Sequence, residues 1–411
     1  MSFNNRVSEP MRQNGFDRRF AARLGDVRAF ESPSSRPLRI CQVVPYDMSE
    51  RGGVKHHAFQ LARELRARGD HVTIIGPSTA PIREPNVVVL SGAANFPANG
   101  SDNRLGLFVS PLRVRRFFRG NHFDVVHLHE PQLPILPYWA LRFSDASAHV
   151  ATFHAFSETP NETLGFFSRL LAPTQRTAFQ VSLAVSDEAA AYARLSWPEP
   201  LTIVPNGVPT SVFTPLVGER RPGPIRLLFV GRLGDPRKGF DDLYEAFRRL
   251  RARGSDLTLD VVGELGGARP PVAMPGLTYH GPVPMGALVE HYRRCDIFVA
   301  PSTGQESFGI VLLEAMATAL PVICSDIPGY RRTVTANGAR LVPPRDIDAL
   351  QRAIVELASQ PDLRRVMGEA NHRRAAMFDW QAVAGRVRDI YLDAIGSRAR
   401  NGKTAGAVTV A

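Results

Sequence analysis

Two glutamates flank a short polar turn and an apolar run in the segment PSTGQESFGIVLLEA, residues 301–315. Glu306 precedes the run and Glu314 lies within it, with seven residues between them. Such a run predicts a helix start, where free backbone N–H groups and the positive end of the helix dipole attract anions. Two carboxylates around an anion site either cap the helix or face a ligand that carries hydroxyls as well as phosphates.

The chemistry of this segment favours a ligand with both groups. With Ser307 as the expected N-cap, the N–H groups of Phe308, Gly309 and Ile310 would be the free donors that bind phosphate. Helical side chains lean toward the N-terminus, so the carboxylate of Glu314 can return toward the same space. Carboxylates there would accept hydrogen bonds from hydroxyls. The segment therefore predicts part of a sugar-nucleotide site, with a diphosphate in the middle of the ligand and polyols at both ends.

A basic loop would supply the positive charge that a diphosphate needs. Arg232, Arg237 and Lys238 lie in VGRLGDPRKG, residues 230–239, directly after an apolar run that predicts a strand. Cations there would neutralise the charge that develops on a leaving diphosphate. Only three of the 50 basic residues are lysines, so Lys238 departs from the chain's bias toward arginine, which is not chemically equivalent. The alternative is a solvated surface loop.

A glycine pair in PYDMSERGGVKHH, residues 45–57, joins the first predicted strand to the first predicted helix. Gly52 and Gly53 at a helix start would let a phosphate approach the backbone closely. A tight strand-to-helix turn is the alternative explanation. We expect the acceptor side of the site, or the cleft itself, to include Tyr46, Lys55, His57 and His154.

Histidines end two of the predicted strands, in HLHEP (127–131) and TFHA (152–155). His127 and His129 share one face of an alternating strand. His129 and His154 lie at strand carboxyl ends, where a ligand cleft is expected. A structural role with satisfied hydrogen bonds is the alternative for each. A metal site is not expected, because no third ligand follows at a recognisable spacing.

Short apolar runs alternate with amphipathic stretches over most of the chain, which predicts parallel sheets with helices on both faces. A Pro-, Gly- and Arg-rich stretch interrupts this pattern and predicts a linker. The expected fold class is α/β, with two doubly wound Rossmann-like domains facing a cleft. The expected boundaries are a mobile tail over 1–37, an N-terminal domain over 38–205, the linker over 206–224, a C-terminal domain over 225–377, a helix over 378–397 that packs back on the N-terminal domain, and a tail over 398–411.

Apolar runs locate the individual elements. Helices are predicted at 54–68, 241–253 and 286–294, among others. Strands are predicted at 38–44, 71–76, 123–129, 148–154, 181–186 and 201–207 in the first domain, and at 225–231, 257–263, 277–281, 296–302 and 320–326 in the second.

Composition limits the class of protein. The 411 residues are 44% apolar and 22% charged, as in a globular protein of about two domains. Three cysteines without a CxxC pair indicate a reducing compartment, with neither disulfides nor a thiolate metal site. The first 37 residues lack the apolar core of a secretory signal, and no apolar run is long enough to span a bilayer. We expect a cytoplasmic protein that can bind peripherally to the inner face of the plasma membrane.

The net charge of +11 favours anionic partners, and one segment concentrates it. A basic amphipathic helix can lie on an anionic membrane, with its arginines and its apolar side chains at the surface. The alternative is a helix that packs on the sheet and has a basic outer face. The segment SPLRVRRFFRG, residues 110–120, predicts a helix with Arg113, Arg115, Arg116 and Arg119 on one side and Val114, Phe117 and Phe118 on the other.

Several of these motifs occur together in the order of a known family. The pattern Glu306-x7-Glu314 in GQESFGIVLLEA, with VGR…RKG and the early Gly-Gly pair, resembles the family-4 retaining glycosyltransferases of GT-B fold. The likeness covers roughly residues 38–395. Within that family, the runs GGVKHH, FDVVHLHEP, VATFHA, DPRKG and ESFGIVLLEAMA are most similar to the bacterial phosphatidylinositol mannosyltransferases.

The resemblance implies roles for the matching residues around the phosphates. Gly53 would lie against the donor phosphates, and Arg232 and Lys238 would hold the diphosphate. His129 would contact the sugar and support the reaction centre. The catalytic set that the resemblance implies is therefore Arg232, Lys238, His129 and Glu306.

The resemblance also divides the two glutamates between parts of the donor. Glu306 would bind sugar hydroxyls, Glu314 would bind the ribose hydroxyls, and the backbone near Val283 would meet the base. Lys55 departs from the family pattern, in which smaller or neutral polar residues are found, so it could alter the choice of acceptor.

The hypothesis that follows is a retaining hexosyltransferase that uses a sugar nucleotide, with GDP-mannose as the leading donor and a membrane lipid such as a phosphatidylinositol-type glycolipid as the acceptor. The alternative enzyme uses a UDP-sugar in lipopolysaccharide, exopolysaccharide or other glycan synthesis. A nucleotide-binding scaffold without turnover is opposed by the intact Glu306, Lys238 and Arg232. A nucleic-acid-binding protein is opposed by the glutamates in the cleft and by the absence of an aromatic-basic motif, so no nucleic-acid partner is expected.

No cofactor or metal is expected, and the sugar nucleotide enters only as a substrate. The motif DID, residues 346–348, matches a carboxylate pair that binds metal in the other major glycosyltransferase fold. Its context before an amphipathic run makes Asp346 an N-cap instead. We therefore expect metal-independent activity.

Overall fold

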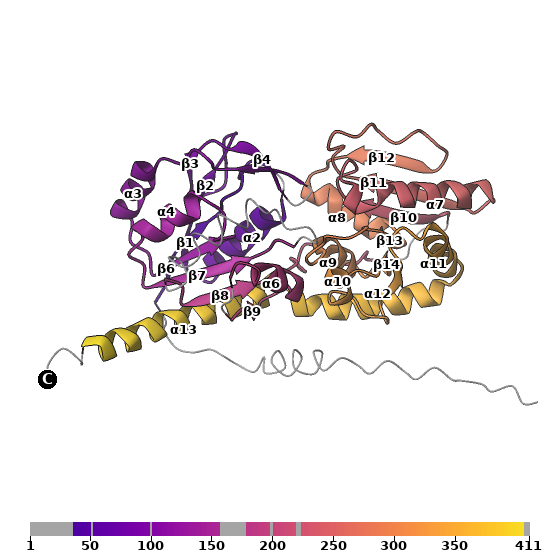
Figure 1. The fold of residues 1–411 in the computed structure, drawn as a ribbon. Helices are drawn as coiled ribbons and strands as arrows, with labels where there is room; N and C mark the ends of the chain where they lie inside the picture. Colours follow the sequence, from indigo (N-terminus) through magenta and orange to yellow (C-terminus); the bar gives the residue numbers. More distant parts are fainter. Residues whose placement is uncertain are drawn as a thin grey trace, which may run out of the picture. The chain divides into compact units, whose positions relative to one another are not determined.

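The computed structural model describes residues 36–50, 52–98, 101–156, 178–197, 200–218 and 223–406. From Pro37 onward the chain forms one compact unit. Within it, two parallel sheets are each covered by helices on both faces, as Figure 1 shows. We call each sheet together with its covering helices a lobe, and we name the two the N-terminal lobe and the C-terminal lobe. Residues 1–35 of the tail expected over 1–37 lie outside the described residues.

The sheet of the N-terminal lobe has seven strands in the order β3-β2-β1-β6-β7-β8-β9, and all its pairings are parallel. Its strands are β1 (Arg39–Val43), β2 (His71–Pro77), β3 (Val87–Ser91), β6 (Val125–His129), β7 (Ala148–Phe153), β8 (Val181–Ala184) and β9 (Thr202–Ile203). Its helices are α2 (Gly53–Ala67), α3 (Pro111–Gly120), α4 (Leu136–Phe143) and α6 (Asp187–Ala193).

Side chains that alternate along the strands bury both faces of this sheet. On one face Ile40 and Val44 lie in a core cluster with residues of α2 and of the C-terminal helix α13 (Trp380–Gly406). On the other face Cys41 and Val43 lie in a cluster with α3 and α4. Burial on both faces explains why these strands read as continuous apolar runs.

A short antiparallel hairpin, β4 (Ala94–Ala98) and β5 (Ser101–Leu105), was not expected from the sequence. It is joined to the loop after β1, because Asp47 donates its N–H to the carbonyl of Arg104 and Gly106 donates its N–H to the carbonyl of Pro45. The hairpin therefore brings Arg104 next to the glycine-containing loop that precedes α2.

The C-terminal lobe has a six-stranded parallel sheet in the order β12-β11-β10-β13-β14-β15. Its strands are β10 (Ile225–Val230), β11 (Leu257–Val262), β12 (Leu277–Gly281), β13 (Ile297–Ala300), β14 (Val322–Ser325) and β15 (Ala339–Val342). Its helical elements are η1 (Pro236–Lys238), α7 (Phe240–Ala252), α8 (Met285–Arg294), α9 (Ile310–Ala317), α10 (Pro328–Arg331), α11 (Ile347–Ser359), α12 (Pro361–Ala375) and η2 (Ala376–Phe378).

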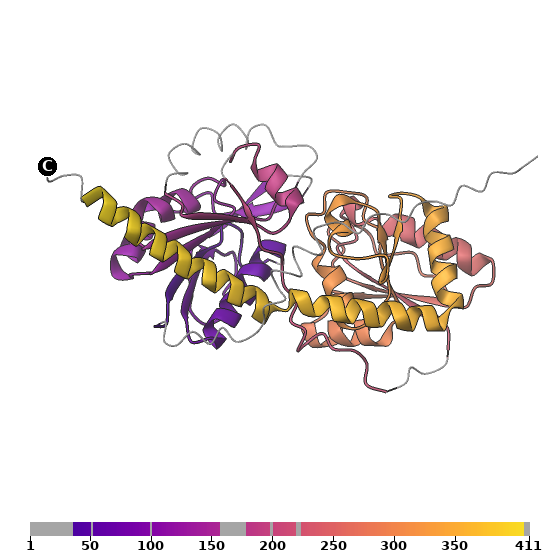
Figure 2. The same cartoon turned by 90° about the horizontal axis from the view of Figure 1, so that it is seen from below.

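The chain passes between the lobes at two neighbouring points. Val208 donates its N–H to the carbonyl of Phe378, and Trp380 donates its N–H to the carbonyl of Val208. Beyond this point α13 leaves the C-terminal lobe and packs against α2 and β7 of the N-terminal lobe, as Figure 2 shows. The helix continues to Gly406, past residue 397, where we expected it to end.

One buried ion pair joins α13 to the N-terminal lobe. The carboxylate of Asp70 is fully buried and accepts hydrogen bonds from Nε and Nη2 of Arg388, at 2.8 and 3.1 Å, and from the N–H of Leu38 at 2.9 Å. A buried carboxylate without its cation is costly, because water no longer solvates it.

We therefore expect Arg388→Ala to lower the free energy of unfolding by about 3–5 kcal/mol, since it leaves the buried Asp70 carboxylate uncompensated. The measurement is urea unfolding followed by circular dichroism. Arg352→Ala, at an exposed position of α11, serves as the control and is expected to change stability by less than about 0.5 kcal/mol. Equal stability of the two variants would contradict this role for the ion pair.

Candidate active site

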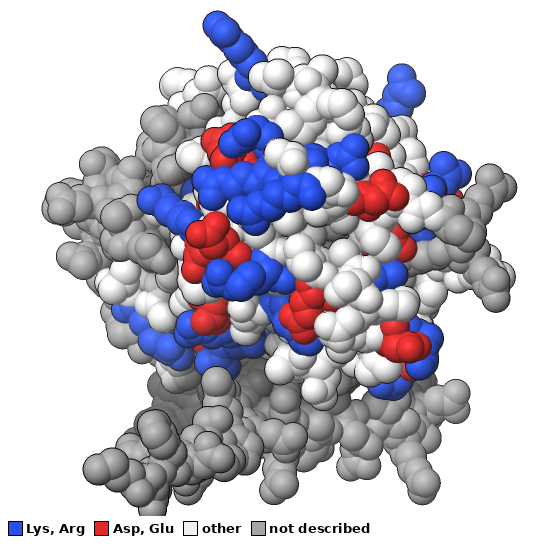
Figure 3. Space-filling model, turned by 90° about the vertical axis from the view of Figure 1, so that its right-hand side faces the viewer, with Lys and Arg blue, Asp and Glu red and all other residues white. Residues whose placement is uncertain are grey.

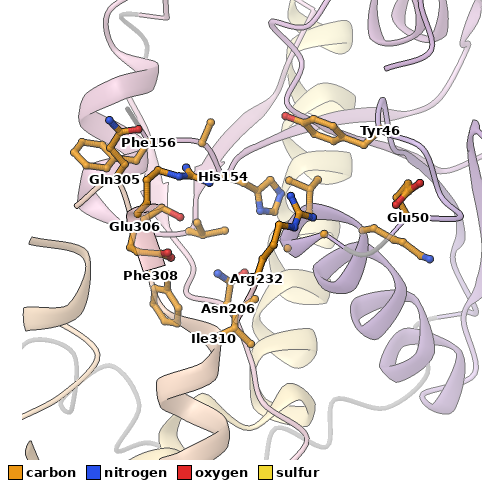
Figure 4. Close-up of a pocket in the computed structure, with 18 of the residues that line it drawn as sticks. Tyr46, Glu50, His154, Phe156, Asn206, Arg232, Gln305, Glu306, Phe308 and Ile310 are labelled. Atoms are coloured by element: carbon orange, nitrogen blue, oxygen red, sulfur yellow. The ribbon is translucent and has the colours of Figure 1, made fainter. Parts of the chain in front are cut away.

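A cavity of about 720 Å³ is lined by segments from both lobes. Its walls come from the loop after β1, from the ends of β6 and β7, and from the segments that follow β10 and β13. Parallel strands of an α/β sheet place ligands at their carboxyl ends, and each of these segments follows such an end. In Figure 4, Tyr46, His154, Arg232 and Glu306 point into this space.

The predicted residues divide into those that line the cavity and those that do not. His57, His129, Val283 and Glu314 are not among the lining residues. The lining residues include the predicted Tyr46, Gly52, Gly53, Lys55, His154, Arg232, Lys238, Glu306, Phe308, Gly309 and Ile310.

The basic loop after β10 meets the glutamate before α9. The ammonium of Lys238 pairs with Oε1 of Glu306 at 2.5 Å, and both side chains are partly exposed to the cavity. Arg232 also lines the cavity, and its Nε lies 3.9 Å from Oε2 of Glu264. Arg237 is bound to the carboxylate of Asp235 by its Nε and Nη2. Lys238 and Arg232 both present a cation to the cavity, each beside a carboxylate.

The helix start in this segment differs from the expectation. Helix α9 begins at Ile310, and its N-cap is Gly309, whose φ of 84° is in the left-handed region. Ser307 is therefore not the N-cap, and Phe308 precedes the helix rather than supplying one of its free N–H groups. A sequence pattern could not reveal this, because the tight turn depends on packing against α10. The first free N–H groups of the helix come from Ile310 and Val311, which both line the cavity.

Packing against α10 holds this turn. A Cβ on Gly309 would lie 2.6 Å from the ring of Tyr330, and Tyr330 itself is hydrogen-bonded to Ser302 at 2.7 Å. Thr333 donates its hydroxyl to the carbonyl of Phe308 at 2.7 Å. The turn that presents Glu306 and the N-terminus of α9 is therefore fixed before any ligand binds, as electrostatic catalysis requires.

The glycine pair on the opposite wall has no structural need to be glycine. A Cβ built on Gly52 or Gly53 would meet no atom within 4 Å, and neither residue has a positive φ. Both line the cavity at the start of α2. Their lack of side chains therefore leaves open space at a helix N-terminus, where an anion is favoured.

Glu314 is held by a protein partner. Its carboxylate is 7% exposed and accepts a hydrogen bond from the hydroxyl of Tyr292 at 2.7 Å. Burial raises the pKa of Glu314 to about 7, although the Tyr292 hydrogen bond opposes this effect. Its expected contact with ribose hydroxyls stays a prediction.

Four buried histidines form a layer at the N-terminal wall of the cavity. Nδ1 of His129 lies 3.0 Å from Nε2 of His154, and Nε2 of His129 lies 3.1 Å from Oε1 of Gln42. His57 approaches Asn206 Oδ1 to 2.7 Å. His127 contacts the hydroxyls of Tyr391 and Thr152. Of these histidines, His154 alone is among the lining residues, so His129 lies one layer behind the surface where we expected it to contact the sugar.

Burial keeps these imidazoles neutral near pH 7. It lowers the pKa of His57 to about 4 and the pKa of His127 to about 3. It also lowers the pKa of His129 and His154 well below the usual value, with further lowering from neighbouring histidines. The layer therefore adds hydrogen-bonding groups to the cavity wall without adding charge.

Three of these histidines are close enough to hold a metal ion. Ligand nitrogens of His57, His129 and His154 lie within 4.8 Å of one another. The sequence showed no third ligand at a clear spacing, because spacings along the chain do not reveal residues that the fold brings together. The expectation that no metal binds stays a prediction. The fold brings His57 from α2 to the strand ends that carry the other two.

Sequence reasoning missed Glu130, an acidic residue of the cavity. Glu130 is 1% exposed, lines the cavity and accepts hydrogen bonds from the N–H groups of His154 and Ala155, at 2.6 and 2.7 Å. Burial raises its pKa, and these hydrogen bonds oppose the rise. The residue also has a positive φ of 50°, a strained conformation typical of functional sites. The sequence feature that could have revealed Glu130 is a carboxylate directly after the strand that ends in His-Leu-His.

The segment at 110–120 forms the expected helix, α3, but its apolar side faces inward. Phe118 is 3% exposed, and Phe117 stacks on Phe123. The prediction that both phenylalanines lie at a membrane surface is therefore wrong, because they pack on the lobe. Arg113 binds the carbonyl of Leu90, and α3 keeps a basic outer face.

Asp346 caps a helix, as expected. Its Oδ1 accepts a hydrogen bond from the N–H of Ala349 at 2.8 Å, at the start of α11.

Two family models match the chain. One, described as Glycosyltransferase Family 4, matches residues 51–212, and the other, described as Glycosyl transferases group 1, matches residues 224–360. The two matches cover most of the N-terminal and C-terminal lobes respectively.

Curated relatives and solved structures agree with these models. A phosphatidyl-myo-inositol mannosyltransferase of Mycobacterium leprae is 36% identical over 366 residues, which span 86% of this chain and 96% of the relative. A protein of the same name from Propionibacterium freudenreichii is 34% identical over 377 residues, which span 86% and 94%. A glycosyltransferase structure from Rickettsia africae superposes with a TM-score of 0.70 at 20% identity, covering 88% of this chain and 99% of that one.

The buried histidine layer makes stability depend on pH. Each imidazole stays neutral in the folded protein but binds a proton in the unfolded chain below pH 6.5, the ordinary histidine pKa. The unfolded state therefore binds more protons, and stability falls as pH drops from about 6.5 toward 4. The expected loss is at most about 1.4 kcal/mol per pH unit for each such histidine.

Urea unfolding at about pH 7.5 and about pH 5.5 measures this loss. His122→Gln provides the control, because His122 is exposed beside Asp145 and its removal should leave the pH dependence unchanged. Equal free energies of unfolding at the two pH values would refute the neutral buried layer.

Proposed function

The chain belongs to the family-4 glycosyltransferases of GT-B fold that include the phosphatidyl-myo-inositol mannosyltransferases, and on that premise we propose that it transfers mannose from GDP-mannose to a phosphatidylinositol-type lipid with retention of configuration. The relatives' names support the sugar and the class of acceptor. The proposal rests on one arrangement. The Lys238–Glu306 pair and the N-terminus of α9 lie across the cavity from the open Gly52-Gly53 loop.

These features suit the parts of a sugar nucleotide. The diphosphate takes Lys238, Arg232 and the first N–H groups of α9, since all three offer positive charge or donors. When the diphosphate draws Lys238 away, the carboxylate of Glu306 is free to accept hydrogen bonds from sugar hydroxyls. His154 offers a neutral imidazole from the opposite wall.

In the transfer step, the bond between the sugar C1 and the diphosphate oxygen breaks and a bond from C1 to the acceptor oxygen forms on the same face. The acceptor hydroxyl gives its proton to the leaving diphosphate. The protein contributes positioning, and the cations stabilise the charge that grows on the leaving group.

Basic groups on the N-terminal wall suit an anionic acceptor. Lys55 and Arg104 both line the cavity, and Arg104 pairs with Glu50 at 2.9 Å where both side chains are about half exposed. A phosphodiester would compete for this guanidinium, while Tyr46 and Glu50 offer groups that hydrogen-bond to a polyol.

Donor and acceptor are identified by a matrix assay. Purified protein is incubated with GDP-mannose, UDP-glucose or UDP-GlcNAc and with vesicles that contain or lack phosphatidylinositol, and lipid products are read by mass spectrometry. The proposal expects one added hexose only with GDP-mannose and phosphatidylinositol. A product from a UDP-sugar alone would replace the proposed donor.

Loss of either partner of the Lys238–Glu306 pair is expected to lower kcat by at least ~10²-fold, because each stabilises charge or hydroxyls in the transition state. The variants are Lys238→Ala and Glu306→Ala, assayed at saturating substrates. Arg248→Ala is the control, since Arg248 lies at the surface of α7 beside Glu245 and should keep full activity. Near-normal turnover in either cavity variant would contradict the assignment.

We also propose that transfer needs no metal ion, because Lys238, Arg232 and the α9 N-terminus supply the positive charge that a divalent cation would otherwise provide. Full turnover at saturating donor is expected after dialysis against EDTA, measured by release of the nucleoside diphosphate. Loss of turnover that Mn²⁺ restores would overturn this proposal.

The protein would reach a lipid acceptor by binding the membrane through α3. Among the described residues, no helix combines the length and apolarity that crossing a bilayer requires. Arg115, Arg116 and Arg119 are exposed and form no ion pair with any described residue. Leu112 and Phe108 are 73% and 83% exposed beside them. By contrast, the C-terminal face in Figure 3 mixes acidic with basic side chains.

We expect the triple variant Arg115→Glu, Arg116→Glu, Arg119→Glu to lose most binding to anionic vesicles, because a basic surface contributes about 1 kcal/mol per arginine. The measurement is co-sedimentation with phosphatidylglycerol vesicles at low and high salt. The control triple replaces Arg352, Arg365 and Arg373, which are exposed on α11 and α12. Equal sedimentation of both triples would exclude α3 as the membrane contact.

A further inference from the structure

A second cluster of chemically active side chains lies in the C-terminal lobe, outside the cavity. It consists of Asp260 on β11, His280 on β12 and His291 on α8. Oδ1 of Asp260 lies 2.6 Å from Nε2 of His280, and the rings of His280 and His291 are 4.2 Å apart. None of the three lines the cavity described above.

An irregularity in the sheet lies beside this cluster. The register of β11 and β12 shifts between Val261 and Val262, which pair with Tyr279 and Gly281, so His280 is the extra residue. Bulges of this kind are frequent next to functional sites. Here the extra residue is the histidine that reaches Asp260.

The donor set has the chemistry of a transition-metal site. Imidazole nitrogen and carboxylate oxygen are ligands that suit Zn²⁺, whereas Mg²⁺ and Ca²⁺ prefer oxygen alone. Tetrahedral ligands at about 2.0–2.2 Å from zinc lie about 3.3 Å from one another. The three ligand atoms already lie within 4.8 Å of one another, so small side-chain rotations complete the geometry.

Neighbouring groups prepare these side chains for a metal. The side chain of His291 makes no hydrogen bond to any described residue, so its nitrogen lone pair remains available. The thiol of Cys295 lies 3.9 Å from the second oxygen of Asp260 and helps to orient the carboxylate.

We propose that Asp260, His280 and His291 form a Zn²⁺ site on the C-terminal lobe, with a fourth position open to solvent. The cavity cluster of His57, His129 and His154 is the weaker candidate, because His129 and His57 already have close polar partners in Gln42 and Asn206.

The position of the site suggests what the metal would do. Residues 282–284 join β12 to α8, and the metal would tie these two elements together on either side of that loop. Val283 lies in the loop, where we expect the nucleotide base to bind, so the metal would hold the loop in one conformation. This consequence rests on the proposed function, but metal binding does not.

The test is a titration of the full-length, EDTA-treated protein with Zn²⁺, followed by calorimetry and by thermal unfolding. We expect saturable binding of one ion and a rise in Tm, since a ligand of the folded state stabilises it. His280→Ala and His291→Ala should each weaken binding by at least ~10-fold and abolish the rise in Tm. Co²⁺ in place of Zn²⁺ gives a visible spectrum that reports the coordination directly.

Two control variants make the outcome decisive. His122→Ala removes the exposed His122–Asp145 pair, which resembles the site but has no third ligand among the described residues, and it should bind Zn²⁺ as the wild type does. Absence of Zn²⁺ binding, or equal affinity in wild type and both site variants, would overturn the proposal. Binding that disappears in His154→Ala but persists in His280→Ala would place the ion in the cavity and overturn it as well. No substrate is used, so failure here is separate from failure of the proposed function.

Discussion

The direction of parallel strands is the constraint on which the site depends. Every strand of a parallel sheet ends at the same edge, so loops that are distant in sequence meet there. The loops after β1, β6, β7, β10 and β13 all line one cavity for this reason. The Lys238–Glu306 pair results directly from this arrangement, because β10 and β13 are neighbours in the sheet.

Charge is distributed unevenly around this cavity. On the C-terminal wall, Lys238, Arg232 and the start of α9 are positive, and Glu306 and Glu264 are carboxylates among them. Behind the N-terminal wall, the buried histidines are neutral. One of them, His127, is hydrogen-bonded to Tyr391 of α13. A ligand with a charged centre and hydroxyl-bearing ends is complementary to such a surface, which is why a sugar nucleotide suits it better than a phosphate chain.

Features that depend on where strands end could be predicted from the sequence. Features that depend on which elements pack together could not. The positions of Lys238 and Glu306 at the cavity followed from apolar runs and the residues after them. The helix start at Ile310 did not, because the left-handed Gly309 depends on the ring of Tyr330. The burial of Phe118 and the meeting of His57 with His154 likewise depend on which elements pack together. The β4–β5 hairpin has no apolar run to reveal it.

We propose that this cavity binds the diphosphate of the donor between the loops of the two lobes. A crystal structure of the protein with GDP tests it most directly. We expect diphosphate oxygens within hydrogen-bonding distance of Nζ of Lys238 and of the first N–H groups of α9, with the Lys238–Glu306 contact lengthened. A diphosphate bound elsewhere, with that ion pair unchanged, would show that the cavity is not the donor site.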